Sequence, residues 1–506
     1  MSSKKDIIKE TGKYTVSTII GKLLSLPYAI VVAKFLGPAL LGTLALYQLI
    51  ISYASYSQLG QLQSLSRQIP IAYGNNDKNK AENIKNILFS SYAVTTLLTL
   101  FIVFVIIQFD VIMPEFLNSQ NTILLIFTLS FSQTCAFLRN YIKAEGQFYI
   151  LANFDIIEKI IRPILGIILI IQFGITGALI NLLIMLSITF LYYITKVNNR
   201  AFIFNLNFKE TVKLIKPGFF IFTSKIAGSL FWNIDLIIIG ILMAKSDVGF
   251  YSLSLNLFIA LGVFSRAISM HMYRKILLKS SDNSPIQEKY NFLIRNNSLY
   301  MLYITMIFGT ATLIYTSLID TILVEYKPAK PIITLINFGY IMFISKNWFS
   351  YYLDATNQLI KRFVIILFGL FINIILDVFL IKSGYGLLGV STGCIIGFFV
   401  ISFPIIFISI SQIKESRIFA AVYLLRHLII TALLSALVYY FTFYDLIDQI
   451  IINEMNQYHV YILALTNLAS ELLIFSSVSI AIYSVFYKND NIVNKIYSNI
   501  KLIYTT

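Results

Sequence analysis

Eight cations fall within or at the ends of the long apolar stretches of this 506-residue chain, and six of them are candidates for substrate binding. The six are Lys22, Lys159, Arg162, Lys225, Arg266 and Lys346. A charged side chain within a membrane span is costly, so such residues face the protein interior or a hydrated cavity. Fixed ammonium and guanidinium groups in a cavity offset the cost of moving an anionic group, such as a diphosphate, through a region of low dielectric constant. We therefore expect these six side chains to bind an anionic substrate.

Lys22 and Lys225 carry the clearest pattern. Each lies eight residues or more inside a predicted span, 14–36 or 217–243, which is too deep for its ammonium group to reach the interface by snorkelling. Each also shares a helical face with small or polar residues, as expected for a side chain that faces a cavity. Those residues are Thr15, Thr18, Ser25 and Ala29 for Lys22, and Gly228, Trp232 and Asp235 for Lys225.

A second group of charges occupies one face of the predicted span 148–171. Its members are Asp155, Glu158, Lys159 and Arg162, at positions i, i+3, i+4 and i+7. This spacing allows the ion pairs Asp155–Lys159 and Glu158–Arg162. Two interpretations stay open, a charged lining of the cavity and a self-neutralising structural cluster near the cytoplasmic interface.

Carboxylates within spans are candidates for coupling transport to an ion, H⁺ or Na⁺. They are Asp155, Glu158, Asp235, Asp377 and Glu471. A structural hydrogen bond is the alternative role for Asp377 and Glu471. Arg266 also has an alternative, an interfacial anchor beside His271 and Arg274. We expect no cofactor and no bound metal beyond such an ion.

The composition requires these residues to be positioned by membrane helices. The chain is 58% hydrophobic and 12% charged, with a mean hydropathy of +0.78, which is too apolar for a soluble protein of this length. The sequence predicts an all-α polytopic membrane protein with fourteen spans. They cover about 14–36, 40–63, 84–109, 121–142, 148–171, 175–196, 217–243, 248–272, 295–319, 330–352, 362–382, 387–411, 419–442 and 459–487. The second span is rich in Gln, Ser and Tyr, so we expect it to line the cavity.

The net charge of +15 does not indicate a nucleic-acid partner, because the cations are concentrated in short loops between apolar spans. Most Lys and Arg residues fall in the two termini and in alternate loops. The opposite connections hold four: Lys245, Lys327, Lys330 and Lys382. The positive-inside rule then places both termini in the cytoplasm. Cys135 and Cys394 both lie in apolar spans and indicate neither a disulfide nor a metal site.

The pattern of residues indicates that spans one to six are repeated as spans seven to twelve. Lys13 and Lys22 recur as Lys216 and Lys225, at an offset of 203, and two further matches around spans five and eleven give offsets of 211 and 212. The order and membrane orientation of the matches indicate parallel repeats about an axis along the membrane normal. We therefore predict an N-lobe (1–197), a cytoplasmic linker (198–216), a C-lobe (217–411) and two further helices with a cytoplasmic tail (412–506).

The predicted chain has fourteen spans in a 6+6+2 plan, that is, two repeats of six spans followed by two more. It also has a Leu36-Gly37-Pro38 turn leading to Gly42 and a turn over 248–252, and these features together resemble those of a known family. The chain resembles Wzx-type flippases, the polysaccharide branch of the MATE-like (MOP) superfamily, over essentially its whole length. The resemblance implies a V-shaped pair of lobes that alternate access. It also implies a substrate, an oligosaccharide of O-antigen or capsule type linked to undecaprenyl diphosphate, which is moved from the cytoplasmic to the outer leaflet.

The same resemblance implies a monomer in the bacterial cytoplasmic (inner) membrane. Its partners would be the lipid-linked oligosaccharide, the bilayer, and the polysaccharide polymerase and chain-length machinery. The family has no catalytic motif to transfer to this chain, so the choice of site residues rests on burial and spacing.

The sequence fits three other functions less well. A MATE-type drug/cation antiporter would use carboxylates for organic cations, whereas interior cations outnumber acids here. A lipid II flippase usually shows an arginine-rich motif in its first helix, where this chain has only Lys22. A polysaccharide polymerase needs a large outward loop, and the longest one here is about 16 residues, around 443–458. No enzyme is expected, because the chain has no phosphate-binding loop, no metal-ligand cluster and no nucleophile elbow.

Overall fold

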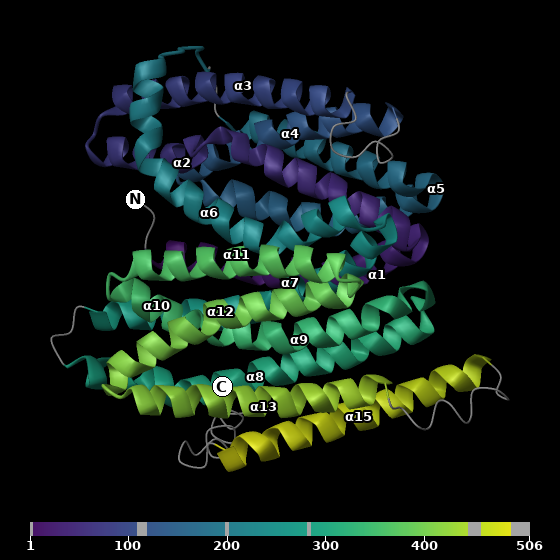
Figure 1. The fold of residues 1–506 in the computed structure, drawn as a ribbon. Helices are drawn as coiled ribbons and strands as arrows, with labels where there is room; N and C mark the ends of the chain where they lie inside the picture. The colour runs from purple at the N-terminus through teal and green to yellow at the C-terminus, as the bar shows by residue number, and fades with distance from the viewer. Residues whose placement is uncertain (1–3, 109–118, 198–201, 281–284, 444–456, 487–506) are drawn as a thin grey trace. The chain divides into compact units, whose positions relative to one another are not determined.

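A computed structural model describes residues 4–108, 119–197, 202–280, 285–443 and 457–486. Throughout these ranges the regular structure is helical (Figure 1), and eleven stretches are long and apolar enough to cross a membrane. The all-α, multi-pass class is therefore confirmed. The number of fourteen spans stays a prediction.

The chain divides into two compact units, residues 1–249 and 250–506. Unit 1 contains α1 (Lys4–Ala54), a 3₁₀ turn η1 (Ser55–Gln58), α2 (Gln61–Gly74), α3 (Lys78–Gln108), α4 (Ser119–Ala144), α5 (Phe148–Lys196), α6 (Phe208–Leu242) and the start of α7 (Lys245–Ser280). Unit 2 contains the rest of α7, α8 (Ile286–Thr321), η2 (Val324–Ala329), α9 (Lys330–Ser345), α10 (Asn347–Ala355), α11 (Leu359–Lys382), α12 (Gly386–Lys414), α13 (Arg417–Phe443) and α15 (Gln457–Phe486). The predicted lobe and linker boundaries stay predictions.

Two of the longest helices are interrupted by a glycine. Gly37 within α1 has φ 70° and ψ 173°, and Gly174 within α5 has φ 56° and ψ −131°. Residues with side chains rarely adopt positive φ, so glycine is the residue that allows the break. Pro38 adds to it at the first site, because proline disfavours helical geometry in the residue before it. Both glycines lie between spans that the sequence predicts as separate.

The predicted second span differs from a continuous helix. After Ala54 the chain passes through η1, Leu59 at φ 49° and Gly60 at φ 94°, and then continues as α2 to Gly74. Gln133 on α4 donates a 2.8 Å hydrogen bond to the carbonyl of Ala54, which also accepts one from Ser57 Oγ, so α4 is tied to the chain at the break. Gly60 also lies against the backbone of Gly218 on α6, where a Cβ would come within 3.1 Å. The interruption between Ala54 and Gln61 therefore lies where α2 packs closely on α6.

Within unit 1, α5 packs on α1 and α4, and α2 packs on α6. The non-helical segment 202–207 before α6 lies along α3: the amide of Ile203 donates to Asn86 Oδ1 and the amide of Asn205 donates to Ser90 Oγ at 2.7 Å. In unit 2, α12 packs on α9 and on α11, its neighbour in Figure 1, while α13 and α15 both lie against α8. At that contact Phe475 of α15 fills the space over Gly309 of α8.

Candidate functional site

Lys346 lies at the junction between α9 and α10, where the predicted tenth span is broken. Its side chain is buried, with only 7% of the residue exposed. The ammonium nitrogen lies 3.9 Å from the centroid of the Phe343 ring, a cation–π contact. Among the described residues no carboxylate lies within ion-pair distance of it. As the C-cap of α9, Lys346 gains some stabilisation from the negative end of the helix dipole.

Two arginines share the surroundings of Lys346. Arg362 at the start of α11 forms a 2.6 Å ion pair with Asp354 of α10, and its charge acts on Lys346. Arg266 of α7 is exposed, donates to the carbonyl of Ile259 at 3.3 Å, and acts electrostatically on Tyr351 together with Arg362. We call Arg266, Lys346 and Arg362 the cationic cluster. Asp354 is the carboxylate paired with it, so the cluster carries a net positive charge.

A hydrogen-bonded network fixes α7 against the α9–α10 junction. The hydroxyl of Tyr300 lies 2.7 Å from Ser265 Oγ and 3.1 Å from Ser269 Oγ. Asn347, next to Lys346, donates to Ser265 Oγ at 3.3 Å. The rings of Tyr300 and Trp348 stack with centroids 4.4 Å apart. The two residues that follow Lys346 are therefore held in place, which helps to position its side chain.

The charged face of α5 forms the cluster that the sequence predicts, with one addition. Glu158 and Arg162 pair at 3.4 Å, as predicted. Asp155, only 4% exposed, accepts two hydrogen bonds from Arg139 of α4 at 3.0 and 2.9 Å. Lys159 is half-buried, within reach of the charges of Asp155, Arg139 and Glu158. Sequence reasoning missed Arg139, whose only signal was its place near the end of span four. The close pairing favours the structural interpretation of this cluster.

The candidate ion-coupling acids have different environments. Asp377 on α11 is fully buried and accepts a 2.9 Å hydrogen bond from Asn373 one turn earlier. Gly393 of α12 packs directly against its carboxylate, where a Cβ would collide with Oδ1. Asp235 on α6 is also buried, at 1% exposed, whereas Glu471 on α15 is half-buried. Ion coupling stays a prediction for all of them.

Lys22 and Lys225 lie in α1 and α6, respectively, and both positions are helical as predicted. Their side chains lie outside the residues that the structure describes. The cavity role of these two lysines therefore stays a prediction from the sequence.

Comparison with known proteins gives a family and a fold. A family model described as "Polysaccharide biosynthesis protein" matches residues 7–272, slightly more than half of the chain. Comparison with curated protein sequences finds no match.

Among solved structures, the chain is similar to the lipid II flippase MurJ in an inward closed conformation, with a TM-score of 0.68 and 15% identity over 94% of this chain and 99% of that one. It is also similar to an inward-facing multidrug resistance MATE family transporter of the MOP superfamily, with a TM-score of 0.57 and 15% identity over 79% of this chain and 95% of that one. At these identities the likeness shows the fold alone.

Proposed function

The chain belongs to the polysaccharide biosynthesis protein family and has the fold of the MOP superfamily, and from that premise we propose that it is a lipid-linked oligosaccharide flippase. Its substrate would be an O-antigen or capsule-type repeat unit on undecaprenyl diphosphate. The direction would be from the cytoplasmic to the outer leaflet of the bacterial inner membrane. Polysaccharide polymerase and chain-length proteins would act on the product.

The observation that carries this proposal is the burial of Lys346 within reach of the charge of Arg362. A buried cation with no carboxylate at ion-pair distance destabilises the folded protein, so a site of this kind is typical of function. The nearby Trp348 Nε1 and Ser350 Oγ are buried polar atoms with no hydrogen-bond partner among the described residues. A diphosphate would accept hydrogen bonds from Lys346 and from Ser350, one helical turn away, and would neutralise the ammonium group.

Transport would proceed by alternating access. The diphosphate would move between cations that line one hydrated path, because each fixed charge replaces part of the hydration that the headgroup gives up. We place Lys22 and Lys225 on this path with Lys346 and Arg266. The carboxylates Asp235, Asp377 and Glu471 are the candidates for coupling the cycle to H⁺ or Na⁺.

Fourteen spans in a 6+6+2 plan, with both termini in the cytoplasm, fit this mechanism. The breaks at Gly37 and Gly174 support the count, since each divides one long helix into two predicted spans. The parallel lobes would each contribute cations to the path.

Translocation of lipid II is a second candidate function, favoured by the extent of the structural likeness. The likeness to MurJ covers 94% of this chain, against 79% for the multidrug transporter. By contrast, the cationic cluster disfavours an antiporter of organic cations, since like charges would repel such a substrate.

Deletion of the gene and complementation test the proposal. Wild-type protein should restore surface polysaccharide and clear the lipid-linked oligosaccharide that accumulates in the deletion strain, as measured by gel analysis and mass spectrometry. Lys22→Ala, Lys225→Ala and Lys346→Ala should express normally and fail to restore it. Lys34→Ala is the matched control, because Lys34 is exposed at the end of the first predicted span, where it can snorkel.

Wild-type polysaccharide in both the Lys22 and Lys225 variants would remove these lysines from the mechanism, and the same result for Lys346 would remove the cationic cluster. The second candidate, translocation of lipid II, would be favoured by a different result. In that case this chain would support growth after depletion of the cell's own lipid II flippase and would have no effect on surface polysaccharide.

A further inference from the structure

Helix α11 packs on its own unit through one narrow stripe. Of its 24 residues, the buried ones are Gly369, Leu370, Asn373 and Asp377, at successive steps of one, three and four. The stripe lies against α12, and a Cβ on Gly369 would collide with Ile401 there. Gly397 of α12 likewise leaves only 3.1 Å between a Cβ and Asn373. These glycines bring the two helices into close contact over the middle of α11.

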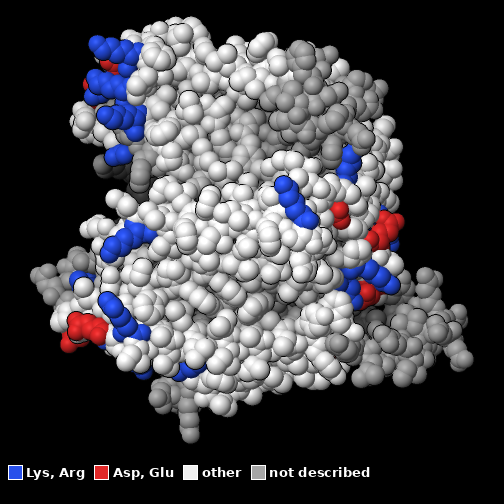
Figure 2. Space-filling model, viewed as in Figure 1, with Lys and Arg blue, Asp and Glu red and all other residues white. Residues whose placement is uncertain are grey.

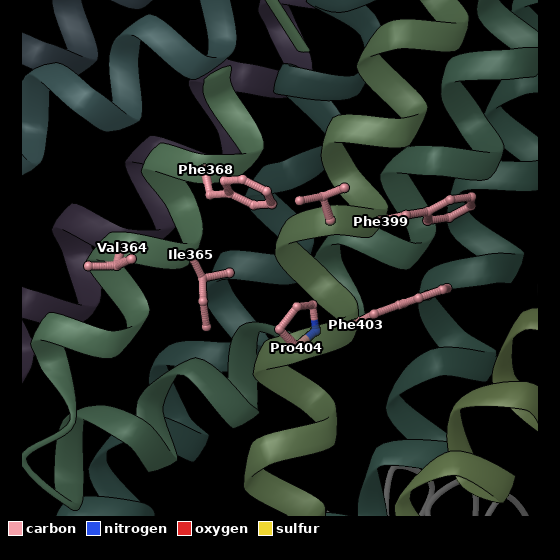
Figure 3. Close-up of a pocket in the computed structure, with 7 residues that line it drawn as sticks. Val364, Ile365, Phe368, Phe399, Phe403 and Pro404 are labelled. Carbon is pink, nitrogen blue, oxygen red and sulfur yellow. The ribbon is translucent and has the colours of Figure 1, made fainter. Parts of the chain in front are cut away.

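Toward the N-terminal end of α11, the same pair of helices encloses an apolar groove of about 420 Å³. Its lining is Val364, Ile365, Phe368, Phe399, Val400, Phe403 and Pro404. In Figure 3, Phe368 and Ile365 extend from α11 toward α12, and the ring of Pro404 faces them. Phe399 and Phe403 stack on each other with centroids 5.1 Å apart, which stiffens the α12 side. Val364 and Phe368 are each 57% exposed, so the groove is open along its length.

A cation lies at one end of this groove. Lys361 shares a helical face with Ile365 and Phe368, at i, i+4 and i+7, and the span from Lys361 to Phe368 is about 10 Å. Its ammonium group is exposed and donates to Gln358 Oε1 at 3.1 Å, and no carboxylate among the described residues is within ion-pair distance of it. Gln358 also exchanges hydrogen bonds with Gln412 of α12. The neighbouring Arg362 is already paired with Asp354, so Lys361 is the charge available to a ligand.

This arrangement matches an amphiphile with an anionic head and a long hydrocarbon chain. Figure 2 shows that the surface between the ends of α11 and α12 carries no Lys, Arg, Asp or Glu, as expected for a face in contact with lipid. The end with Lys361 is the cytoplasmic one under the positive-inside rule, which is the side where the lipid-linked substrate is made available. Branched and aromatic side chains on both helices offer van der Waals contacts to a methyl-branched chain.

We propose that the α11–α12 groove binds the polyprenyl chain of the lipid-linked substrate, with Lys361 beside its phosphate groups. This inference rests on the proposed function and adds a site to it. The hydrocarbon chain cannot enter a hydrated, cationic path without losing its apolar surroundings, so it stays in the bilayer while the headgroup crosses. A groove on the lipid-facing side of unit 2 holds the chain next to the transporter and raises the local concentration of substrate.

Variants that fill the groove test the proposal on the purified full-length protein. Val364→Trp places a large ring in the groove from an exposed position, so folding should be preserved; Val400→Trp fills it from α12. The probes are undecaprenyl phosphate and phosphatidylglycerol, with bound lipid quantified by native mass spectrometry. In both variants the amount of bound undecaprenyl phosphate should fall by about tenfold or more. Displacing two or more methylene groups from an apolar site lowers the binding free energy by enough to give such a change. Retention of phosphatidylglycerol should not change.

Matched controls lie on the same helix. Phe371→Trp alters an exposed residue of α11 outside the groove lining and should bind both lipids as the wild type does. Lys361→Gln should weaken undecaprenyl phosphate binding severalfold, whereas Lys382→Gln at the other end of α11 should not.

Two results would overturn the inference and leave the groove as ordinary lipid-contacting surface. One is equal retention of the two lipids by the wild type, and the other is unchanged binding of undecaprenyl phosphate in both tryptophan variants. The proposed function is read out separately. If wild-type protein restores surface polysaccharide while the groove variants bind and transport normally, only the inference fails; if wild-type protein restores none, the proposed function fails.

Discussion

At the scale of single residues, Lys346 differs from Arg139 and Arg162, which also lie in predicted spans but have carboxylate partners. Arg162 pairs with Glu158 and Arg139 pairs with Asp155, so their charges are largely neutralised within the structure. In place of a carboxylate, the ammonium group of Lys346 contacts the aromatic ring of Phe343, and the residue lies at the C-terminal end of α9. Since a cation–π contact and a helix dipole offset only part of the cost of burying an ammonium group, the stability of the fold does not account for this lysine.

Replacing Lys346 with Met should therefore separate stability from activity. Met keeps the length of the side chain and removes the buried charge, so the variant should be as stable as the wild type or more stable. Its transport activity, measured as surface polysaccharide, should be lost. Arg362→Met is the contrasting variant, because it leaves Asp354 without its partner and should destabilise the protein by roughly 1–3 kcal/mol. Thermal unfolding of the purified variants in detergent gives the stabilities, and a clear loss of stability in Lys346→Met would contradict the argument.

At the scale of elements, glycines set where helices end and how closely they pack. Gly37 and Gly174 end spans through positive φ. Gly42 and Gly249 act differently, through close approach. A Cβ on Gly42 would collide with the carbonyl of Lys245, and one on Gly249 would collide with the carbonyl of Pro38. The turns that follow the first and seventh predicted spans therefore touch backbone to backbone, which explains why both turns carry a glycine.

Gly249→Ala should consequently destabilise this contact by about 1–3 kcal/mol and reduce transport, because the backbone of one turn must move away from the other. Gly228→Ala is the matched control: Gly228 lies in the interior of α6, and nothing lies within 4 Å of an added Cβ. That variant should be neutral or slightly more stable, as expected for alanine in a helix. Equal stability of the two variants, measured by thermal unfolding, would show that the close contact of the turns is unimportant.

At the scale of the whole molecule, the prediction is topological. Fourteen spans place the C-terminus in the cytoplasm and the turn at Gly384, between α11 and α12, on the outer side. A fluorescent protein that matures in the cytoplasm should be bright when fused after Thr506, and alkaline phosphatase should be active when inserted at Gly384 and inactive after Thr506. With the N-terminus in the cytoplasm, an active phosphatase at the C-terminus would require an odd number of spans and would exclude the 6+6+2 plan.

The sequence by itself determined the features that depend on local order along the chain. Hydropathy determined the polytopic all-α class, glycine next to proline at Gly37 marked the end of a helix, and spacing of four residues predicted the Glu158–Arg162 pair. These features involve residues within one or two helical turns of each other, where geometry is fixed by the helix itself.

Only the tertiary structure decided which charges meet. It paired Asp155 with Arg139, brought Lys346 within reach of the charge of Arg362, and formed the groove between α11 and α12. Each of these joins residues on different helices. Such contacts depend on how helices rotate and pack against one another, and a pattern along a single helix does not contain that information.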